Sequence, residues 1–132
     1  MKTLIVEDDF TSRLLLQELL KVYGPIHIAI NGREAITAVQ IAVQEEEPYD
    51  LICMDIMMPE VDGQQALREI RDIETATGIP SSDGAKIVMT TALGDIDDVR
   101  DAFSSLCDAY LIKPIRKADL LKKLVELGLT DS

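Results

Sequence analysis

Five short apolar runs alternate with five helical patterns along this chain, and the alternation limits the fold more than any other feature. Helical spacing of apolar residues fills the gaps between the runs. Right-handed connections between neighbouring parallel strands then predict an α/β fold with a doubly wound five-stranded parallel sheet, five helices and strand order 2-1-3-4-5. The runs are Thr3–Val6, Ile26–Ile30, Leu51–Met54, Lys86–Met89 and Ala109–Ile112, and the helical patterns are Phe10–Tyr23, Gly32–Glu46, Gln64–Thr77, Ile96–Leu106 and Lys117–Leu127.

The runs also indicate where each strand lies in this flavodoxin-like topology. Four of them are continuously apolar, which is typical of parallel strands buried on both faces. Ile26–Ile30 comes closer to alternation and therefore fits a position nearer the edge of the sheet. A chain of 132 residues is the size of one domain. We expect a single domain over residues 1–132, with no effector domain.

Charge and composition exclude several classes of protein. A formal net charge of −11 disfavours direct binding to nucleic acid or to an anionic membrane, and it suits basic partners and divalent cations. The sequence has no apolar stretch of the roughly 20 residues that span a bilayer and no signal-peptide pattern, so we expect a cytoplasmic protein. Cys53 lies inside an apolar run and is expected to be a buried, reduced thiol, and the two cysteines suggest no disulfide framework.

Polar residues of particular kinds follow four of the five apolar runs. The carboxyl ends of parallel strands meet at one edge, where open α/β sheets place their ligand sites. Clustered carboxylates at such an edge repel one another and bind a hard cation well, which predicts a Mg²⁺ site with one aspartate free to react. The residues are Asp8-Asp9, Asp55, Thr90-Thr91 and Lys113-Pro114.

Taken in order, these residues resemble the response-regulator receiver domain of two-component signalling, the family that includes the single-domain chemotaxis regulator. The resemblance covers nearly the whole chain. Each motif alone is weakly specific, but all of them at successive strand ends are highly specific. The motifs are Glu7-Asp8-Asp9, Asp55-x-x-Met58-Pro59-x-x-Asp62-Gly63, Thr91-Ala92, and Lys113-Pro114 preceded by Tyr110.

The resemblance implies that Asp55 accepts a phosphoryl group and forms an acyl phosphate. Lys113 would place its charge on a phosphoryl oxygen, and the Thr91 hydroxyl would donate to another. A divalent cation, Mg²⁺ or Mn²⁺, would offset the repulsion between carboxylate and phosphate. Its expected ligands are Asp8, Asp9, Asp55 and the backbone carbonyl of Met57.

The resemblance also implies a switch. Thr91 would move toward the phosphoryl group and Tyr110 would turn inward to fill the vacated space. The surface formed by Ile96–Leu106, Ala109–Ile112 and Lys117–Leu127 would change shape as a result. A cis peptide before Pro114 would orient Lys113.

Each of these residues has an ordinary structural alternative. Asp8-Asp9 could cap the helix that follows, and Asp55 could be a turn residue before Pro59. Thr91 could bond to backbone at a strand end. Lys113 could be a solvated surface lysine, and Tyr110 a half-buried tyrosine with no special role.

Two apolar residues depart from the chemotaxis regulator's pattern. Met57 and Leu93 flank the expected path of the hydrolytic water, and neither side chain can orient it, so we expect slow self-dephosphorylation. Phe10 and Arg13 begin the first predicted helix beside the site. They could form a docking surface for a histidine kinase or a phosphotransfer protein, or Phe10 could simply pack on the loop that contains Pro59.

The leading hypothesis is a phosphorylation-activated switch rather than a turnover enzyme. It would react with a histidine kinase or phosphotransfer protein, bind an output partner, and exist as a monomer or a phosphorylation-dependent dimer. The alternative within the same family is a phosphorelay intermediate that passes phosphate to a histidine phosphotransfer domain.

A flavodoxin-like cofactor binder is disfavoured because acidic residues replace a phosphate loop after the first strand, and the chain has no Trp. An aspartate-based phosphohydrolase would usually carry an acid where this chain has Met57. A degenerate scaffold is disfavoured because every site position is filled.

Overall fold

Five strands form one parallel sheet with the predicted order β2-β1-β3-β4-β5. The computed structural model describes residues 1–56, 63–79, 84–97, 100 and 106–131. β2 is an edge strand, as the alternation of Ile26–Ile30 predicted, whereas every residue of the more central β1 and β3 is buried. The strands are β1 (Thr3–Val6), β2 (Ile26–Ala29), β3 (Leu51–Asp55), β4 (Lys86–Ala92) and β5 (Ala109–Lys113).

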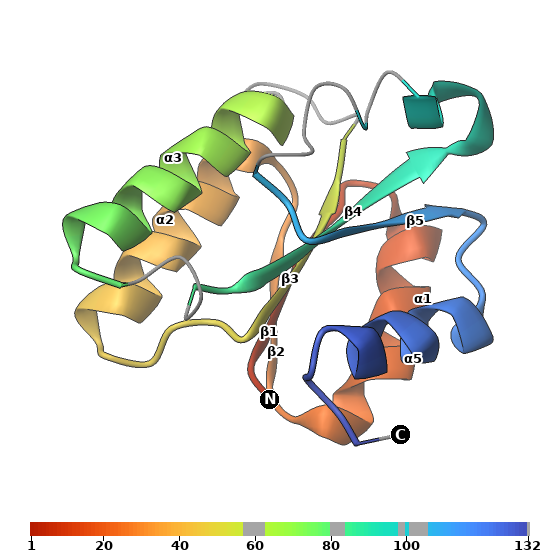
Figure 1. The fold of residues 1–132 in the computed structure, drawn as a ribbon, viewed down its shortest axis with the longest axis horizontal. Helices are drawn as coiled ribbons and strands as arrows, with labels where there is room; N and C mark the ends of the chain where they lie inside the picture. The colour runs from red at the N-terminus through yellow and green to blue at the C-terminus, as the bar shows by residue number, and fades with distance from the viewer. Residues whose placement is uncertain (57–62, 80–83, 98–99, 101–105, 132) are drawn as a thin grey trace.

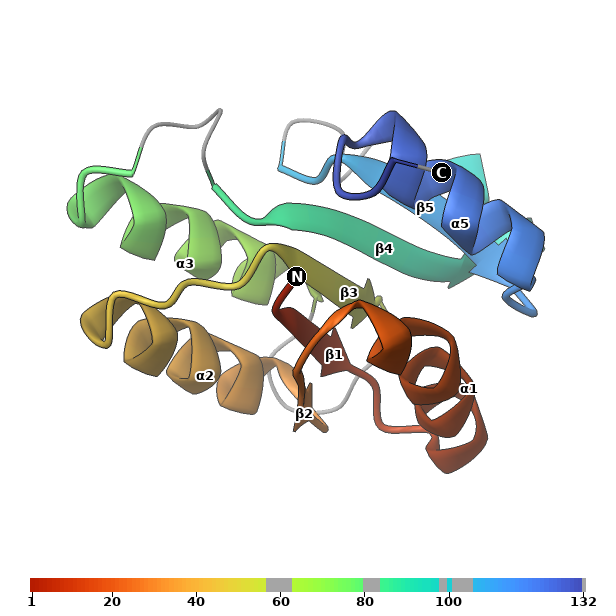
Figure 2. The ribbon, with the colours of Figure 1, turned by 90° about the horizontal axis from the view of Figure 1, so that it is seen from below.

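Helices cover both faces of the sheet. α2 (Gly32–Gln44) and α3 (Gly63–Ala76) lie on one face, and α1 (Phe10–Leu20) and α5 (Lys117–Glu126) lie on the other (Figures 1 and 2). The helix predicted over Ile96–Leu106 falls largely outside the described residues. Within it, the backbone of Ile96, Asp97 and Arg100 is helical.

The sheet separates two apolar cores, because successive strand residues point to opposite faces. The first core is packed by α2 and α3, and the second by α1 and α5. The largest fully buried side chains of the first core are Leu4, Ile52, Met54, Leu67, Ile70, Ile87 and Met89, and those of the second are Ile5, Leu16, Leu20, Leu51 and Leu120.

The first helix is shorter than its apolar pattern suggested. α1 ends at Leu20, and Lys21–Tyr23 form a separate 3₁₀ turn. Gly24 then turns the chain into β2 with a φ of 145°, and a Cβ at this position would overlap the carbonyl oxygen of Met1. Only glycine fits a positive φ at such a close backbone approach, so the chain must leave the helical conformation before this residue.

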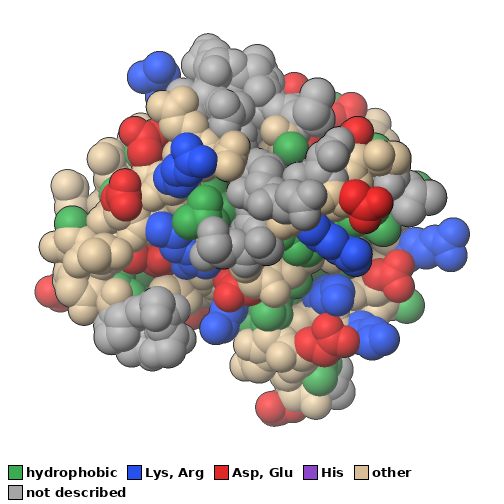
Figure 3. Space-filling model, turned by 45° about the horizontal axis from the view of Figure 1, so that its top comes forward, with side chains coloured by type: hydrophobic (Ala, Val, Ile, Leu, Met, Phe, Trp, Pro, Cys, Tyr) green, Lys and Arg blue, Asp and Glu red, His purple; other side chains and the backbone are tan. Residues whose placement is uncertain are grey.

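Both cysteines are free, and Cys53 is buried within β3 as expected. Burial raises the pKa of the Cys53 thiol to about 12, which makes it unreactive at neutral pH. In the portion of the chain that is described, no helix is both long enough and apolar enough to cross a bilayer. Acidic and basic side chains are interspersed over the face shown in Figure 3, although the whole chain is strongly acidic.

Candidate functional site

Four polar side chains emerge on one face of the sheet at its carboxyl edge. The residue two positions earlier in each strand belongs to the core beneath α1 and α5, so alternation places the polar residues on that same face. The core residues are Ile5, Cys53, Val88 and Leu111. The polar residues that follow them are Glu7, Asp55, Thr90 and Lys113.

Three carboxylates converge at this edge. Glu7, Asp8 and Asp55 each offer one oxygen atom, and these oxygens lie within 4.8 Å of one another. Two oxygens bound directly to Mg²⁺ at about 2.1 Å are at most about 4.2 Å apart, and Mg²⁺ usually keeps several of its waters. The group is therefore compact enough to hold Mg²⁺ after a small adjustment or through one bridging water.

The structure confirms that Asp8 and Asp55 lie together, but it places Glu7 beside them instead of Asp9. Asp9 is the N-cap of α1, where its carboxylate accepts a hydrogen bond of 2.9 Å from the backbone N–H of Ser12. This bond lowers the pKa of Asp9. The helix-capping alternative therefore describes Asp9, and the geometry does not support Asp9 as a metal ligand.

Glu7 is the site residue that the sequence interpretation missed. Its side chain is 0% exposed, and it continues the direction of Ile5 at the end of β1. Two signals could have identified it. Glu7 directly follows the buried strand, and Asp9 precedes Ser12 by the three-residue spacing of a capping bond.

Lys113 forms ion pairs with two members of this cluster of carboxylates, Glu7 and Asp55. Its Nζ atom lies 3.0 Å from Oε2 of Glu7 and 3.3 Å from Oδ2 of Asp55. Burial raises the pKa of Glu7 to about 7, although the hydrogen bond from Lys113 acts in the opposite direction. Burial lowers the pKa of Lys113, but the hydrogen bond to Glu7 and the charge of Asp55 outweigh it and leave this pKa raised. Lys113 therefore stays charged beside Asp55.

β4 contributes two adjacent threonines with different surroundings. β4 is longer than its apolar run and includes both of them. Thr90 is opposite Asp55 in the register, on the same face as the carboxylates, whereas Thr91 points to the α2–α3 face. The Thr91 hydroxyl donates a 3.4 Å hydrogen bond to the carbonyl oxygen of Ala92. The backbone-bonded alternative thus describes Thr91 in this state.

Comparison with known families gives this arrangement its context. The family described as the response regulator receiver domain matches residues 3–125, which is most of the chain. The chain belongs to this receiver-domain family. The expected resemblance is therefore confirmed, and with it a role in two-component signalling.

Known receiver domains resemble this chain in sequence and in fold. The chemotaxis protein CheY of Halobacterium salinarum is 30% identical over 126 residues, which cover 96% of this chain and 95% of that protein. Hybrid signal transduction histidine kinase B of Dictyostelium discoideum is 36% identical over 95% of this chain, but the match covers only 6% of that kinase. The match thus spans nearly the whole of CheY but only a small part of the kinase.

Solved receiver structures share the topology. A co-crystal structure of the Saccharomyces cerevisiae phosphotransfer protein Ypd1 with the receiver domain of Ssk1 matches with a TM-score of 0.79 and 33% identity, covering 97% of this chain and 88% of the other. The receiver domain of sensor histidine kinase PA1611 from Pseudomonas aeruginosa matches with a TM-score of 0.74 and 27% identity, covering 96% and 97%. That structure carries a magnesium ion in its active-site cleft.

In this receiver domain the two expected switch residues share the face opposite Asp55. Tyr110 packs against the core that α2 and α3 form, and Met89, its partner in the register, belongs to the same core. The Tyr110 hydroxyl is buried and has no hydrogen-bond partner among the described residues. Burial raises the pKa of Tyr110. The side chain is thus turned inward, and Thr91 lies two positions beyond Met89 along β4, on the same face.

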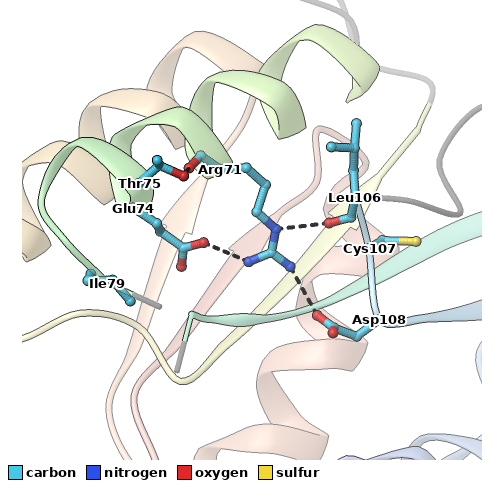
Figure 4. Close-up of a pocket in the computed structure, with 7 residues that line it drawn as sticks. All are labelled: Arg71, Glu74, Thr75, Ile79, Leu106, Cys107 and Asp108. Atoms are coloured by element: carbon cyan, nitrogen blue, oxygen red, sulfur yellow. Dashed lines mark hydrogen bonds and ion pairs between the residues drawn. The ribbon is translucent and has the colours of Figure 1, made fainter. Parts of the chain in front are cut away.

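Arg71 of α3 anchors the segment that leads into Tyr110 (Figure 4). Its guanidinium donates to the carbonyl oxygen of Leu106 at 2.9 Å and to the Asp108 carboxylate at 3.1 Å. It also donates to Glu74 at 2.7 Å and to the carbonyl oxygen of Ala85 at 3.0 Å. One side chain therefore joins α3, the start of β4 and the entry to β5.

The remaining expectations divide into one that is confirmed and two that lie outside the description. The Lys113–Pro114 peptide bond is cis, as expected. Met57, the expected carbonyl ligand, is outside the described residues. Leu93 begins a short 3₁₀ turn after β4, but its side chain is not among those described.

Proposed function

We propose that Asp55 accepts a phosphoryl group in a Mg²⁺-dependent reaction and that this receiver domain acts as a phosphorylation-activated switch. The observation that supports the proposal is the position of Asp55 beside two other carboxylates and the ammonium group of Lys113. Asp55 is within 4.8 Å of Glu7 and Asp8 by its nearest oxygens, and Lys113 is 3.3 Å from its Oδ2. Phosphoryl transfer depends mainly on such positioning and charge neutralisation.

The proposed reaction is an in-line displacement at phosphorus. A carboxylate oxygen of Asp55 forms a new P–O bond, while the bond between phosphorus and the donor's nitrogen or oxygen breaks and the donor leaves with that electron pair. Asp8, Asp55 and Glu7 would hold Mg²⁺, which would neutralise charge on the phosphoryl oxygens. Lys113 would donate to one of these oxygens, and Thr91 to another after leaving Ala92.

Intact-mass measurement with acetyl phosphate and Mg²⁺ tests this proposal. We expect a single phosphoryl adduct on the parent protein. The adduct should be absent from Asp55→Asn and from the parent treated with EDTA. A parent protein that binds Mg²⁺ in calorimetry yet takes no adduct would contradict the proposal and favour a phosphorylation-independent scaffold.

We further propose that the phosphodonor protein docks on α1. Phe10 begins this helix beside the site and is 66% exposed, and the guanidinium of Arg13 lies 5.5 Å from the centre of its ring. Leu14 and Leu15 continue the exposed apolar surface along α1. Exposed aromatic and apolar residues of this kind are typical of protein interfaces.

The docking proposal separates a protein donor from a small one. Phe10→Ala should slow phosphoryl transfer from a phosphorylated histidine phosphotransfer domain about tenfold but leave the reaction with acetyl phosphate unchanged. Val22→Ala is the matched control, because Val22 is 74% exposed but lies beyond the far end of α1. Equal rates for Phe10→Ala and Val22→Ala with the protein donor would remove Phe10 from the interface.

A long-lived phosphoaspartate is the third part of the proposal. It rests on the apolar residues at positions 57 and 93, which cannot orient a hydrolytic water. Met57→Asn and Leu93→Glu should each shorten the lifetime of the acyl phosphate. Unchanged lifetimes in both variants would show that these positions do not control hydrolysis.

A phosphorelay role is the second candidate function. It is favoured by the similarity to hybrid kinases and to a receiver that was crystallised with a phosphotransfer protein. A relay intermediate should pass its phosphoryl group onward to a histidine phosphotransfer domain. A direct output switch should instead keep the group and change its affinity for an output partner.

A further inference from the structure

Thr90 carries a buried hydroxyl group that the fold does not use. The residue is 1% exposed, and its Oγ1 atom has no hydrogen-bond partner among the described residues. Leaving a buried hydroxyl unpaired destabilises a fold, because the group gives up its hydrogen bonds to water and gains none in return. A valine of nearly the same shape would avoid that cost, so the hydroxyl needs an explanation outside folding.

The position of Thr90 supplies one. Thr90 is directly opposite Asp55 in the register of β3 and β4, and both side chains lie on the α1–α5 face. β4 lies between β3 and β5, so the Lys113 side chain must cross β4 on this face to reach Asp55 and Glu7. The unpaired hydroxyl therefore lies next to the acceptor aspartate, on the face of β4 that the lysine side chain crosses.

We propose that Thr90 is a positioning residue for the phosphorylation of Asp55, an inference that rests on the function proposed above. When Asp55 attacks phosphorus, one of its oxygens becomes the bridging atom and the other becomes a carbonyl oxygen. Lys113 then donates to the phosphoryl group and no longer to Oδ2. The Thr90 hydroxyl donates to the carbonyl oxygen that Lys113 has left, and so holds the carboxyl plane in the orientation for in-line attack.

Such a hydroxyl is unpaired in the resting state and paired during reaction. Its hydrogen bond therefore stabilises the transition state more than the ground state, which is the condition for accelerating a step. Thr90 acts through Asp55 and does not itself touch the phosphoryl group. This role differs from that of Thr91, which faces the opposite side of β4.

The test compares Thr90→Val with Thr90→Ser in the full chain. With acetyl phosphate and saturating Mg²⁺, Thr90→Val should slow formation of the adduct about tenfold, while Thr90→Ser should stay within about threefold of the parent. Urea titration should show that Thr90→Val is more stable than the parent, because it removes an unpaired buried hydroxyl. Mg²⁺ affinity from calorimetry should be the same in all three proteins. Lower reactivity combined with higher stability is a result that a structural role does not produce.

Three results would overturn the inference. One is a Thr90→Val rate within twofold of the parent, and another is an equal loss of rate in Thr90→Ser. The third is a less stable Thr90→Val, which would show that the fold uses the hydroxyl. Failure of the proposed function looks different, because the parent itself would then take no phosphoryl group, and the inference would fall with it. Should Thr90→Val not fold, Thr90→Ala compared with Thr90→Ser applies the same criterion.

Discussion

Lys113 and Glu7 are 106 positions apart in the chain, yet their side chains form an ion pair of 3.0 Å at the carboxyl edge of the sheet. The pair holds the lysine over Asp55 before any phosphoryl group is present. Glu7 is fully buried, and its charge is stabilised by this cation and by a hydrogen bond of 3.1 Å from the backbone N–H of Asp9. The pair links the stability of the fold to the chemistry of the site.

The raised pKa of Glu7 predicts that the metal-free protein loses stability as the pH rises. Its pKa is about 7 in the folded protein and 4.5 in the reference state, so the folded state holds the proton more tightly. The resulting stability is fully present below about pH 4.5 and is lost as the pH rises through about 7. Glu7→Gln has no such proton, so it should gain about 2–3 kcal/mol relative to the parent between pH 5 and pH 8. Urea unfolding in EDTA at both values measures this, and a constant difference would contradict it.

Asp8 and Asp9 should separate metal binding from helix capping. Asp8→Asn should weaken Mg²⁺ binding tenfold or more, because it removes a carboxylate from the acidic group, with little change in stability. Asp9→Ala should keep Mg²⁺ affinity but be less stable than the parent, because it loses the capping bond to Ser12. Calorimetry and urea unfolding give the two quantities. Asp9→Asn is the control because asparagine also caps helices, and an equal loss of Mg²⁺ affinity in Asp9→Ala would restore Asp9 as a ligand.

Lys113 should have opposite effects on metal binding and on reaction. Its ammonium occupies the same carboxylates that would bind Mg²⁺, so Lys113→Met should raise Mg²⁺ affinity severalfold. The same variant should react with acetyl phosphate at least tenfold more slowly, because no fixed cation then meets the phosphoryl oxygens. Calorimetry and intact mass measure the two effects. Lower affinity in Lys113→Met would show that the lysine organises the metal site instead of competing for it.

Arg71 should be a major source of stability. Arg71→Ala would leave the buried carboxylate of Glu74 without its cation and free the bonds to Leu106 and Asp108. We expect a loss of about 3 kcal/mol in the free energy of unfolding. Arg71→Lys keeps the charge but cannot reproduce the planar set of donors, so it should recover only part of the loss. Full recovery with lysine would mean that charge alone stabilises this network.

The sequence by itself determined the architecture of this protein. Continuous apolar runs such as Leu51–Met54 are typical of parallel strands buried on both faces, and the helical patterns between them favour parallel pairing and the strand order that the structure has. The strand-end positions of Asp55 and Lys113 also followed from the sequence, because all parallel strands end at the same edge. The positions of strands, helices and strand ends depend on the local periodicity of apolar residues, which can be read directly from the sequence.

Only the tertiary structure decided which acidic residue enters the site. Glu7, Asp8 and Asp9 are adjacent and chemically alike, and the sequence interpretation assigned Asp8 and Asp9 to the metal, whereas the structure groups Glu7 and Asp8 with Asp55. At the end of β1, Glu7 forms an ion pair with Lys113, whereas Asp9 is the N-cap of α1. The unpaired hydroxyl of Thr90 could not be predicted from the sequence either, because its burial and its lack of a hydrogen-bond partner depend on residues of neighbouring strands. Side-chain direction at a strand end is set by where the strand stops and the helix begins, and packing between distant segments decides that point.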